Sequence, residues 1–142
     1  MEGRKLTQLL GRFKGNGRLL LLYALLYFLF GLGMNALGIA LGIARFTFWW
    51  QVFTCYVLYM VPISFLLRKY PFHVQYAYGL VATGILEFLG YTLNTSYAYP
   101  DNPIDRFFGI RNFSLAMALF FAFYFPLGNW AVGHLYRRLF SN

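Results

Sequence analysis

The sequence predicts an all-α integral membrane protein: a four-helix bundle with one longer extracytoplasmic loop that carries a short interfacial helix. The chain of 142 residues is 60% hydrophobic and only 11% charged, whereas a soluble domain carries about 25% charged residues. It contains four apolar runs of roughly 20 residues, the length that matches the ~30 Å hydrocarbon core of a bilayer. The basic residues lie at the ends of these runs, where they set membrane topology.

Residues 1–18 form a basic N-terminal segment in which Leu6, Leu9 and Phe13 recur at helical spacing. This pattern predicts a short amphipathic helix on the anionic cytoplasmic face of the membrane. A charged tail without fixed structure is the alternative. The rest of the chain, residues 19–142, is expected to be one transmembrane domain.

The first predicted span covers residues 19–44 and changes from bulky to small side chains along its length. Gly31, Gly38 and Gly42 share one helical face with Asn35. Small residues allow another helix to approach closely, and an asparagine amide can hydrogen-bond across such a contact. We therefore expect this face to pack against a neighbouring helix.

The other predicted spans cover residues 47–67, 74–93 and 113–135. Pro62 lies inside the second span and is expected to kink it. We expect Ser64 or neighbouring groups to compensate the carbonyl group that the proline leaves free.

The loop between the third and fourth spans is expected to hold a short helix. Asn102 followed by Pro103 is typical of a helix cap and a first-turn proline, and Asp105 falls in that turn. Asp101 and Asp105 could pair with Arg106 or Arg111. The loop residues expected to cover the outer end of the bundle are Tyr97, Tyr99, Asp101, Asp105 and Arg106.

The basic residues predict the orientation. Four spans place both termini on one side, which holds nine basic residues, against three on the other. This asymmetry predicts that both termini are cytoplasmic, and we expect the bacterial inner membrane. The nine are Arg4, Lys5, Arg12, Lys14, Arg18, Arg68, Lys69, Arg137 and Arg138; the three are Arg45, Arg106 and Arg111.

Glu87 is the one acidic residue inside a long apolar run. An acid in hydrocarbon costs a few kcal/mol and marks a functional site by default. Spacing at about 1.5 Å per residue places polar residues of three predicted spans at similar depth in the outer half of the bundle. In a dry site the Glu87 carboxyl group is expected to be protonated and to donate a hydrogen bond. The predicted polar cluster is Asn35, Gln51, Thr54, Glu87 and Tyr91.

Four functions are compatible with this cluster. The carboxyl group could lock helices together through Asn35 or Gln51. The chain could be an accessory membrane subunit, an enzyme acting on a lipid, or a proton or ion translocator. We favour the accessory subunit, which packs against partner helices, a second copy of the chain, membrane lipids or lipidic cofactors. The sequence does not identify a cofactor.

The leading alternative is a membrane enzyme in which Glu87 acts as acid or base beside Tyr91 on a lipid or isoprenoid. The order Glu87, Gly90, Tyr97, Tyr99 resembles the E-x-x-G and later Y-x-Y pattern of membrane carotenoid-modifying hydratases. This resemblance implies isoprenoid chemistry at Glu87. It is confined to residues 87–99, the spacing after Gly90 differs, and the Thr-Gly of that pattern is missing.

Nucleic-acid binding and metal binding are not expected. No basic face with interleaved base-stacking aromatics lies outside the apolar runs. The chain has one cysteine, Cys55, and no Cys/His metal-binding spacing.

Overall fold

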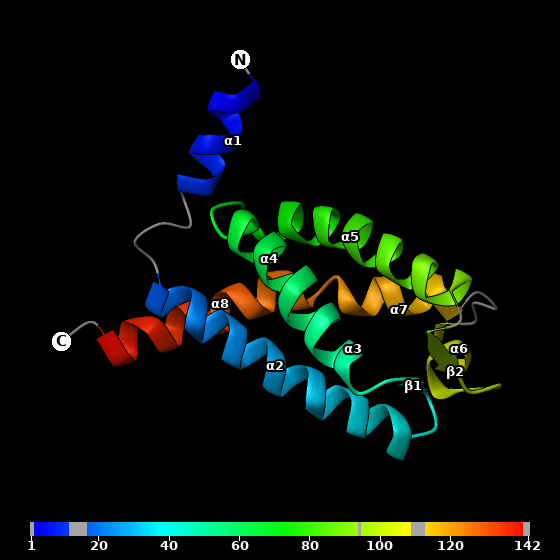
Figure 1. Ribbon diagram of the computed structural model, residues 1–142. Helices are drawn as coiled ribbons and strands as arrows, with labels where there is room; N and C mark the ends of the chain where they lie inside the picture. Colours follow the sequence, from blue (N-terminus) through cyan, green and yellow to red (C-terminus); the bar gives the residue numbers. More distant parts are fainter. Residues whose placement is uncertain (1, 12–16, 94, 109–112, 141–142) are drawn as a thin grey trace.

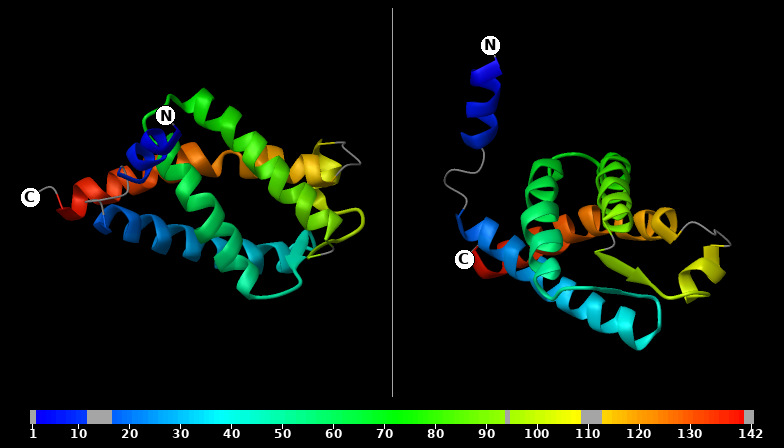
Figure 2. Two further views of the ribbon diagram at one scale, coloured as in Figure 1. Left: turned by 45° about the horizontal axis from the view of Figure 1, so that its top comes forward. Right: turned by 45° about the vertical axis from the view of Figure 1, so that its right-hand side comes forward.

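The computed structural model describes residues 2–11, 17–93, 95–108 and 113–140, and it is mostly helical (81%). The N-terminal helix α1 (Glu2–Gly11) falls in the predicted amphipathic segment and stands apart from the other helices in Figure 1. The long helix α2 (Gly17–Ala40) packs against the second helical unit and against the C-terminal helix. Figure 2 shows this arrangement from two further sides.

The second helical unit contains Pro62, as the sequence predicts, and changes its winding just before it. Proline has no N–H group to donate one turn back, so the regular α-helical pattern fails there. Wider π-helical turns lie directly upstream. Ser64 does not compensate the free carbonyl as predicted, because its hydroxyl group lies 2.8 Å from the hydroxyl of Tyr27 on α2. The unit consists of α3 (Trp50–Val52), η1 (Phe53–Met60) and α4 (Val61–Leu67).

The predicted fourth span is broken into two helices, α7 (Phe113–Phe121) and α8 (Tyr124–Phe140). Pro126 explains the break, because it cannot donate to the carbonyl group of Ala122. The helix α5 (Phe72–Thr92) packs along α7 and α8. Gly79 on α5 permits this packing, since a Cβ atom there would overlap with the ring of Phe125.

In the described residues, three helical segments are long and apolar enough to cross a membrane. They are α2 (Gly17–Ala40), the second helical unit (Trp50–Leu67) and the run of α7 and α8 (Leu115–Phe140). They indicate an integral multi-pass membrane protein. The predicted count of four spans is not confirmed, because α5 is not among them. Polar residues such as Gln75 and Glu87 lower its hydropathy.

A short antiparallel ladder joins the connection after α2 to the connection after α5, a detail that the all-α prediction does not include. Strand β1 (Ala44–Phe46) pairs with β2 (Ser96–Ala98), with Arg45 opposite Tyr97. The sequence instead predicts that residues 44–46 belong to the end of the first span and the short link after it. The ladder satisfies main-chain groups that would otherwise lack partners near the bilayer.

The three glycines predicted to pack helices have different roles. Gly31 faces η1, where an added Cβ atom would lie 2.8 Å from Tyr56 and Val52. Gly38 faces the main-chain carbonyl of Ala44 in β1 rather than a helix. Gly42 lies beyond the end of α2, with φ of 65° and no atom within 4 Å of an added Cβ. Its assignment as a helix-packing residue is therefore wrong: it serves the turn that sends the chain into β1.

Candidate functional site: an apolar cavity around Glu87

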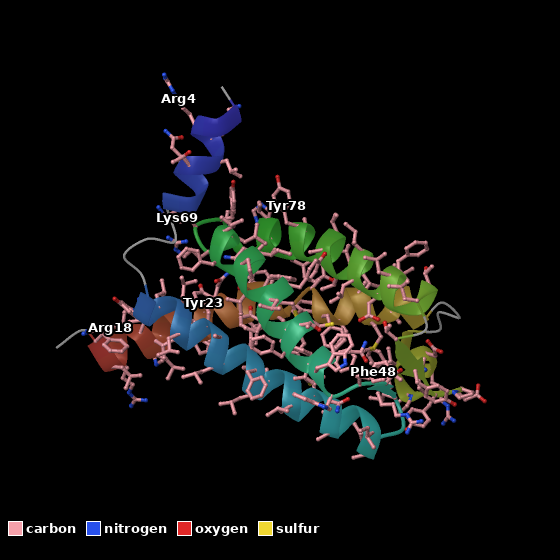
Figure 3. All side chains as sticks on the ribbon, in the orientation of Figure 1. Arg4, Arg18, Tyr23, Phe48, Lys69 and Tyr78 are labelled. Atoms are coloured by element: carbon pink, nitrogen blue, oxygen red, sulfur yellow. The ribbon has the colours of Figure 1, made fainter. Side chains whose placement is uncertain are left out.

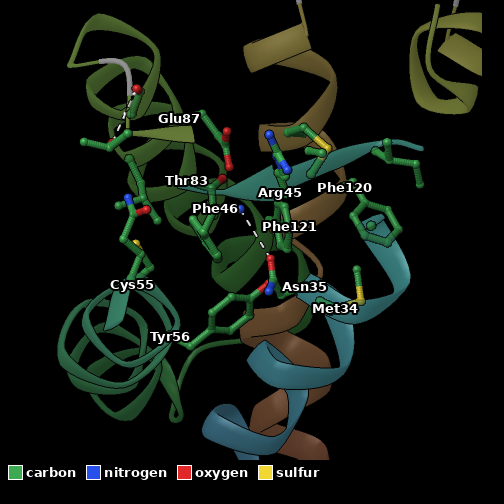
Figure 4. Close-up of a pocket in the computed structure, with 18 of the residues that line it drawn as sticks. Met34, Asn35, Arg45, Phe46, Cys55, Tyr56, Thr83, Glu87, Phe120 and Phe121 are labelled. Atoms are coloured by element: carbon green, nitrogen blue, oxygen red, sulfur yellow. Dashed lines mark hydrogen bonds between the residues drawn. The ribbon is translucent and has the colours of Figure 1, made fainter. Parts of the chain in front are cut away.

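A cavity of about 700 Å³ lies at the end of the bundle that carries β1 and β2. Its walls come from α2, η1, α5 and α7, and most of its lining is apolar. Cavities of this size bury drug-sized ligands, and such sites combine apolar walls with a few polar groups. Figure 4 shows it with Glu87, Asn35, Tyr56 and Cys55 among the residues around it.

Strand β1 and helix α6 (Pro103–Phe108) line the cavity at its outer end. The helix forms where the sequence predicts it. The Asn102 side chain accepts a hydrogen bond from the Asp105 N–H at 2.9 Å, which caps the first turn. Pro103, Ile104 and Phe107 then contribute to the lining.

Four residues of the predicted polar cluster line this one cavity: Asn35, Gln51, Thr54 and Glu87. The oxygen atoms of the two amides are already engaged. Asn35 Oδ1 accepts from the Phe46 N–H at 3.3 Å, and Gln51 Oε1 accepts from the Phe48 N–H at 2.8 Å. The side chain of Tyr91, the fifth member, lies outside what the structure describes.

Glu87 is half-buried, and no described residue hydrogen-bonds to its carboxyl group or forms an ion pair with it. The expected bond to Asn35 or Gln51 is not formed. Arg45 is the one basic residue among the described residues of the cavity lining, and its guanidinium group lies over the ring of Tyr97 at 5.3 Å. The carboxyl group therefore faces the cavity without a partner in the described part of the chain.

Sequence reasoning missed Tyr56, which lies on η1 and also lines the cavity. Its ring packs edge-on against Phe46 and Phe121, at centroid distances of 6.5 and 6.1 Å. In Figure 4 its hydroxyl group points toward Asn35. The chain has 12 tyrosines, and no sequence signal distinguishes Tyr56 from the others. Its position in the folded structure identifies it as a cavity residue.

The predicted loop residues do not form a second site. Asp101 has φ of 54° and belongs to the turn before α6. Asp105 takes part in the Asn102 cap, and neither acid forms an ion pair with Arg106. Tyr97 and Tyr99 stack edge-on at 5.0 Å. Tyr97 is one of the exposed residues at this end.

A second polar group, at the other end of the bundle, was also missed. Asn129 on α8 accepts a hydrogen bond from the Tyr23 hydroxyl and donates to Gln75 Oε1 at 2.6 Å. These bonds join α2, α5 and α8, and each partner is satisfied, which suits a role in helix packing. A depth count from the sequence places Asn129 near the inner boundary but cannot show what it faces.

No group of three or more possible metal ligands occurs in the described residues. His73 and His134 are exposed and belong to different helices. No protein family model, curated protein or solved structure matches this chain.

Proposed function

We propose that this chain is a small multi-pass membrane subunit that holds one lipidic molecule in the cavity around Glu87. The observation that carries the proposal is the Glu87 carboxyl group, which faces an apolar cavity and has no partner among the residues that the structure describes. A polar group kept in such surroundings costs free energy unless something bonds to it. A ligand with a long apolar part and one polar group would match both the lining and the acid.

We propose four spans, with α5 as the third. The outward side of α5 is apolar: Val81, Ile85 and Phe88 are all more than half exposed, while Gln75 and Thr83 are buried. A helix in water would show the opposite pattern, whereas a helix in lipid turns its polar residues inward.

The charges support termini on the cytoplasmic side. The start of α2, the link between α4 and α5, and the end of α8 lie at one end of the bundle, and β1, β2 and α6 at the other (Figure 1). Figure 3 shows Arg18 and Lys69 at the first end and Phe48 at the second. Arg12, Lys14 and Arg111 lie outside the described residues.

Single cysteines placed at Lys69 and Arg106 in a Cys55→Ala background test this topology. Labelling of both by a membrane-impermeant maleimide from the same side would contradict it.

The ligand is tested by purifying the protein from its native membrane in nanodiscs and extracting what it carries. Mass spectrometry should find one lipidic molecule in stoichiometric amount. Leu86→Trp places a large ring in the cavity lining and should therefore prevent the ligand from binding. Ile85→Trp is the matched control, because Ile85 is 51% exposed on the outer side of α5. Equal ligand content in the two variants, or none in the unaltered protein, would overturn the proposal.

The subunit role is tested in the same preparation by identifying the proteins that accompany the chain. Apolar residues such as Leu21, Leu25 and Leu29 are more than half exposed along α2 and would contact lipid or partner helices. A stoichiometric membrane partner supports a subunit. If the chain purifies alone with its ligand, the result would support the binding site and contradict the subunit role.

An enzyme is the second candidate, favoured by the same carboxyl group, to which no described residue bonds. A protonated Glu87 could transfer its proton to a double bond or activate a hydroxyl group of a bound isoprenoid. Conversion of the bound molecule by the purified protein, lost in Glu87→Gln, would identify this chemistry. Retention of the bound molecule unchanged over prolonged incubation would speak against it.

A further inference from the structure

We infer that the cavity selects a lipid bearing a carbonyl oxygen, such as an isoprenoid quinone or ketone, over a plain hydrocarbon or an alcohol. The inference rests on the proposed function and concerns the polar end of the ligand. It follows from the hydrogen-bonding groups that the cavity leaves free, which are mainly donors. Asn35, Gln51 and Tyr56 are the uncharged residues of the lining whose donors carry this inference.

The two amide side chains are held in a defined orientation. A main-chain N–H can be satisfied only by an amide oxygen, so the bonds from Phe46 and Phe48 fix the oxygens of Asn35 and Gln51. The NH₂ groups must then be on the opposite sides of these amides. No described residue accepts a hydrogen bond from either NH₂ group, and both residues line the cavity.

Tyr56 adds a hydroxyl group. The residue is almost wholly buried (3% exposed) and lines the cavity, yet no described residue bonds to its hydroxyl. This sets it apart from Tyr59 on the same segment, whose hydroxyl donates to the Ala82 carbonyl at 2.8 Å. The bound molecule is then the natural acceptor for Tyr56.

Asn35, Gln51 and Tyr56 line the same cavity as Glu87, and each carries a donor that no described residue accepts. A protonated Glu87 would add a further donor. Acceptor oxygens match this set, because a carbonyl oxygen can take two hydrogen bonds and offers no competing donor. A site built to hydrogen-bond a ligand strongly rejects an analogue that lacks the group, since its own buried polar groups are left unpaired.

The test compares three compounds with one prenyl tail: a prenylated benzoquinone, the prenyl alcohol and the matching hydrocarbon. Binding to the full chain in nanodiscs is measured by equilibrium titration, with protection of Cys55 from N-ethylmaleimide as a local readout. Cys55 is the only cysteine of the chain and lines the cavity. The quinone should bind about tenfold or more tighter than the hydrocarbon, and also tighter than the alcohol.

Tyr56→Phe should lower quinone affinity about tenfold and leave hydrocarbon affinity unchanged. The ring contacts with Phe46 and Phe121 are kept in this variant. Tyr59→Phe is the matched control and should bind quinone like the unaltered protein.

The outcomes separate the two proposals. If none of the three compounds binds or protects Cys55, the lipid-binding function itself fails. Equal binding of all three, or tighter binding of the alcohol, would leave the function standing and overturn the selection for a carbonyl oxygen. An unchanged quinone affinity in Tyr56→Phe would also overturn it.

Discussion

The hydroxyl group of Tyr27 occupies the space that a side chain at Gly128 would need. A Cβ atom added to Gly128 would overlap with the Tyr27 hydroxyl oxygen. That hydroxyl donates to the main-chain carbonyl of Tyr124 at 2.8 Å and lies 2.8 Å from the Ser64 hydroxyl. The Tyr27 hydroxyl thus joins α2, α4 and α8, at the point where Tyr27 lies against the backbone of Gly128.

Gly128→Ala should therefore destabilise the bundle by about 1–3 kcal/mol, the usual cost of overpacking. The added methyl group would force the Tyr27 hydroxyl away from its two partners. The free energy of unfolding is measured by SDS titration in mixed micelles. Gly133→Ala, on the same helix with nothing within 4 Å of an added Cβ, should change stability little. Equal losses in the two variants would contradict the proposed overlap.

Asn129→Leu should lower the free energy of unfolding by about 1–3 kcal/mol, because it leaves buried polar groups unpaired. Tyr23 loses its acceptor and Gln75 loses its donor. The double variant with Tyr23→Phe should cost less than the sum of the two single changes. Strict additivity would show that the Tyr23–Asn129 bond contributes nothing.

Glu87→Leu should behave in the opposite way. No described protein group bonds to the carboxyl, so the ligand-free protein should be as stable as the unaltered one or more stable, because an apolar residue replaces a polar one in apolar surroundings. Ligand content should nevertheless fall. Unfolding of the delipidated protein and lipid mass spectrometry measure the two effects. A stability loss as large as that of Asn129→Leu would instead indicate that Glu87 holds the helices together.

Asn102→Ala should loosen α6 at the outer end of the cavity. The Asn102 side chain accepts from the Asp105 N–H, and losing such a cap costs about 1 kcal/mol. Faster hydrogen–deuterium exchange should be confined to residues 103–108. Asn102→Ser keeps a capping oxygen and should exchange more slowly than Asn102→Ala. Faster exchange along α5 or α7 as well would show that the cap supports more than α6.

The features that depend on local chemistry can be predicted from the amino-acid sequence. Apolar runs predicted four spans, of which three are long and apolar enough to cross a membrane. Pro62 predicted where a helix is disturbed, and the Asn102–Pro103 pair predicted α6. Counting residues along helices also grouped Asn35, Gln51, Thr54 and Glu87, because depth in a bilayer follows directly from helical rise.

Which side chains face one another depends on the packing of the helices and cannot be predicted from local sequence. The β1–β2 pairing joins segments that are remote in the sequence, and no local pattern signals it. The positions of Tyr56 and Asn129 depend on the rotation of each helix about its axis. In a soluble helix the apolar stripe reveals that rotation. Here apolar residues surround the helices, because lipid covers their outer sides, and packing alone settles the rotation.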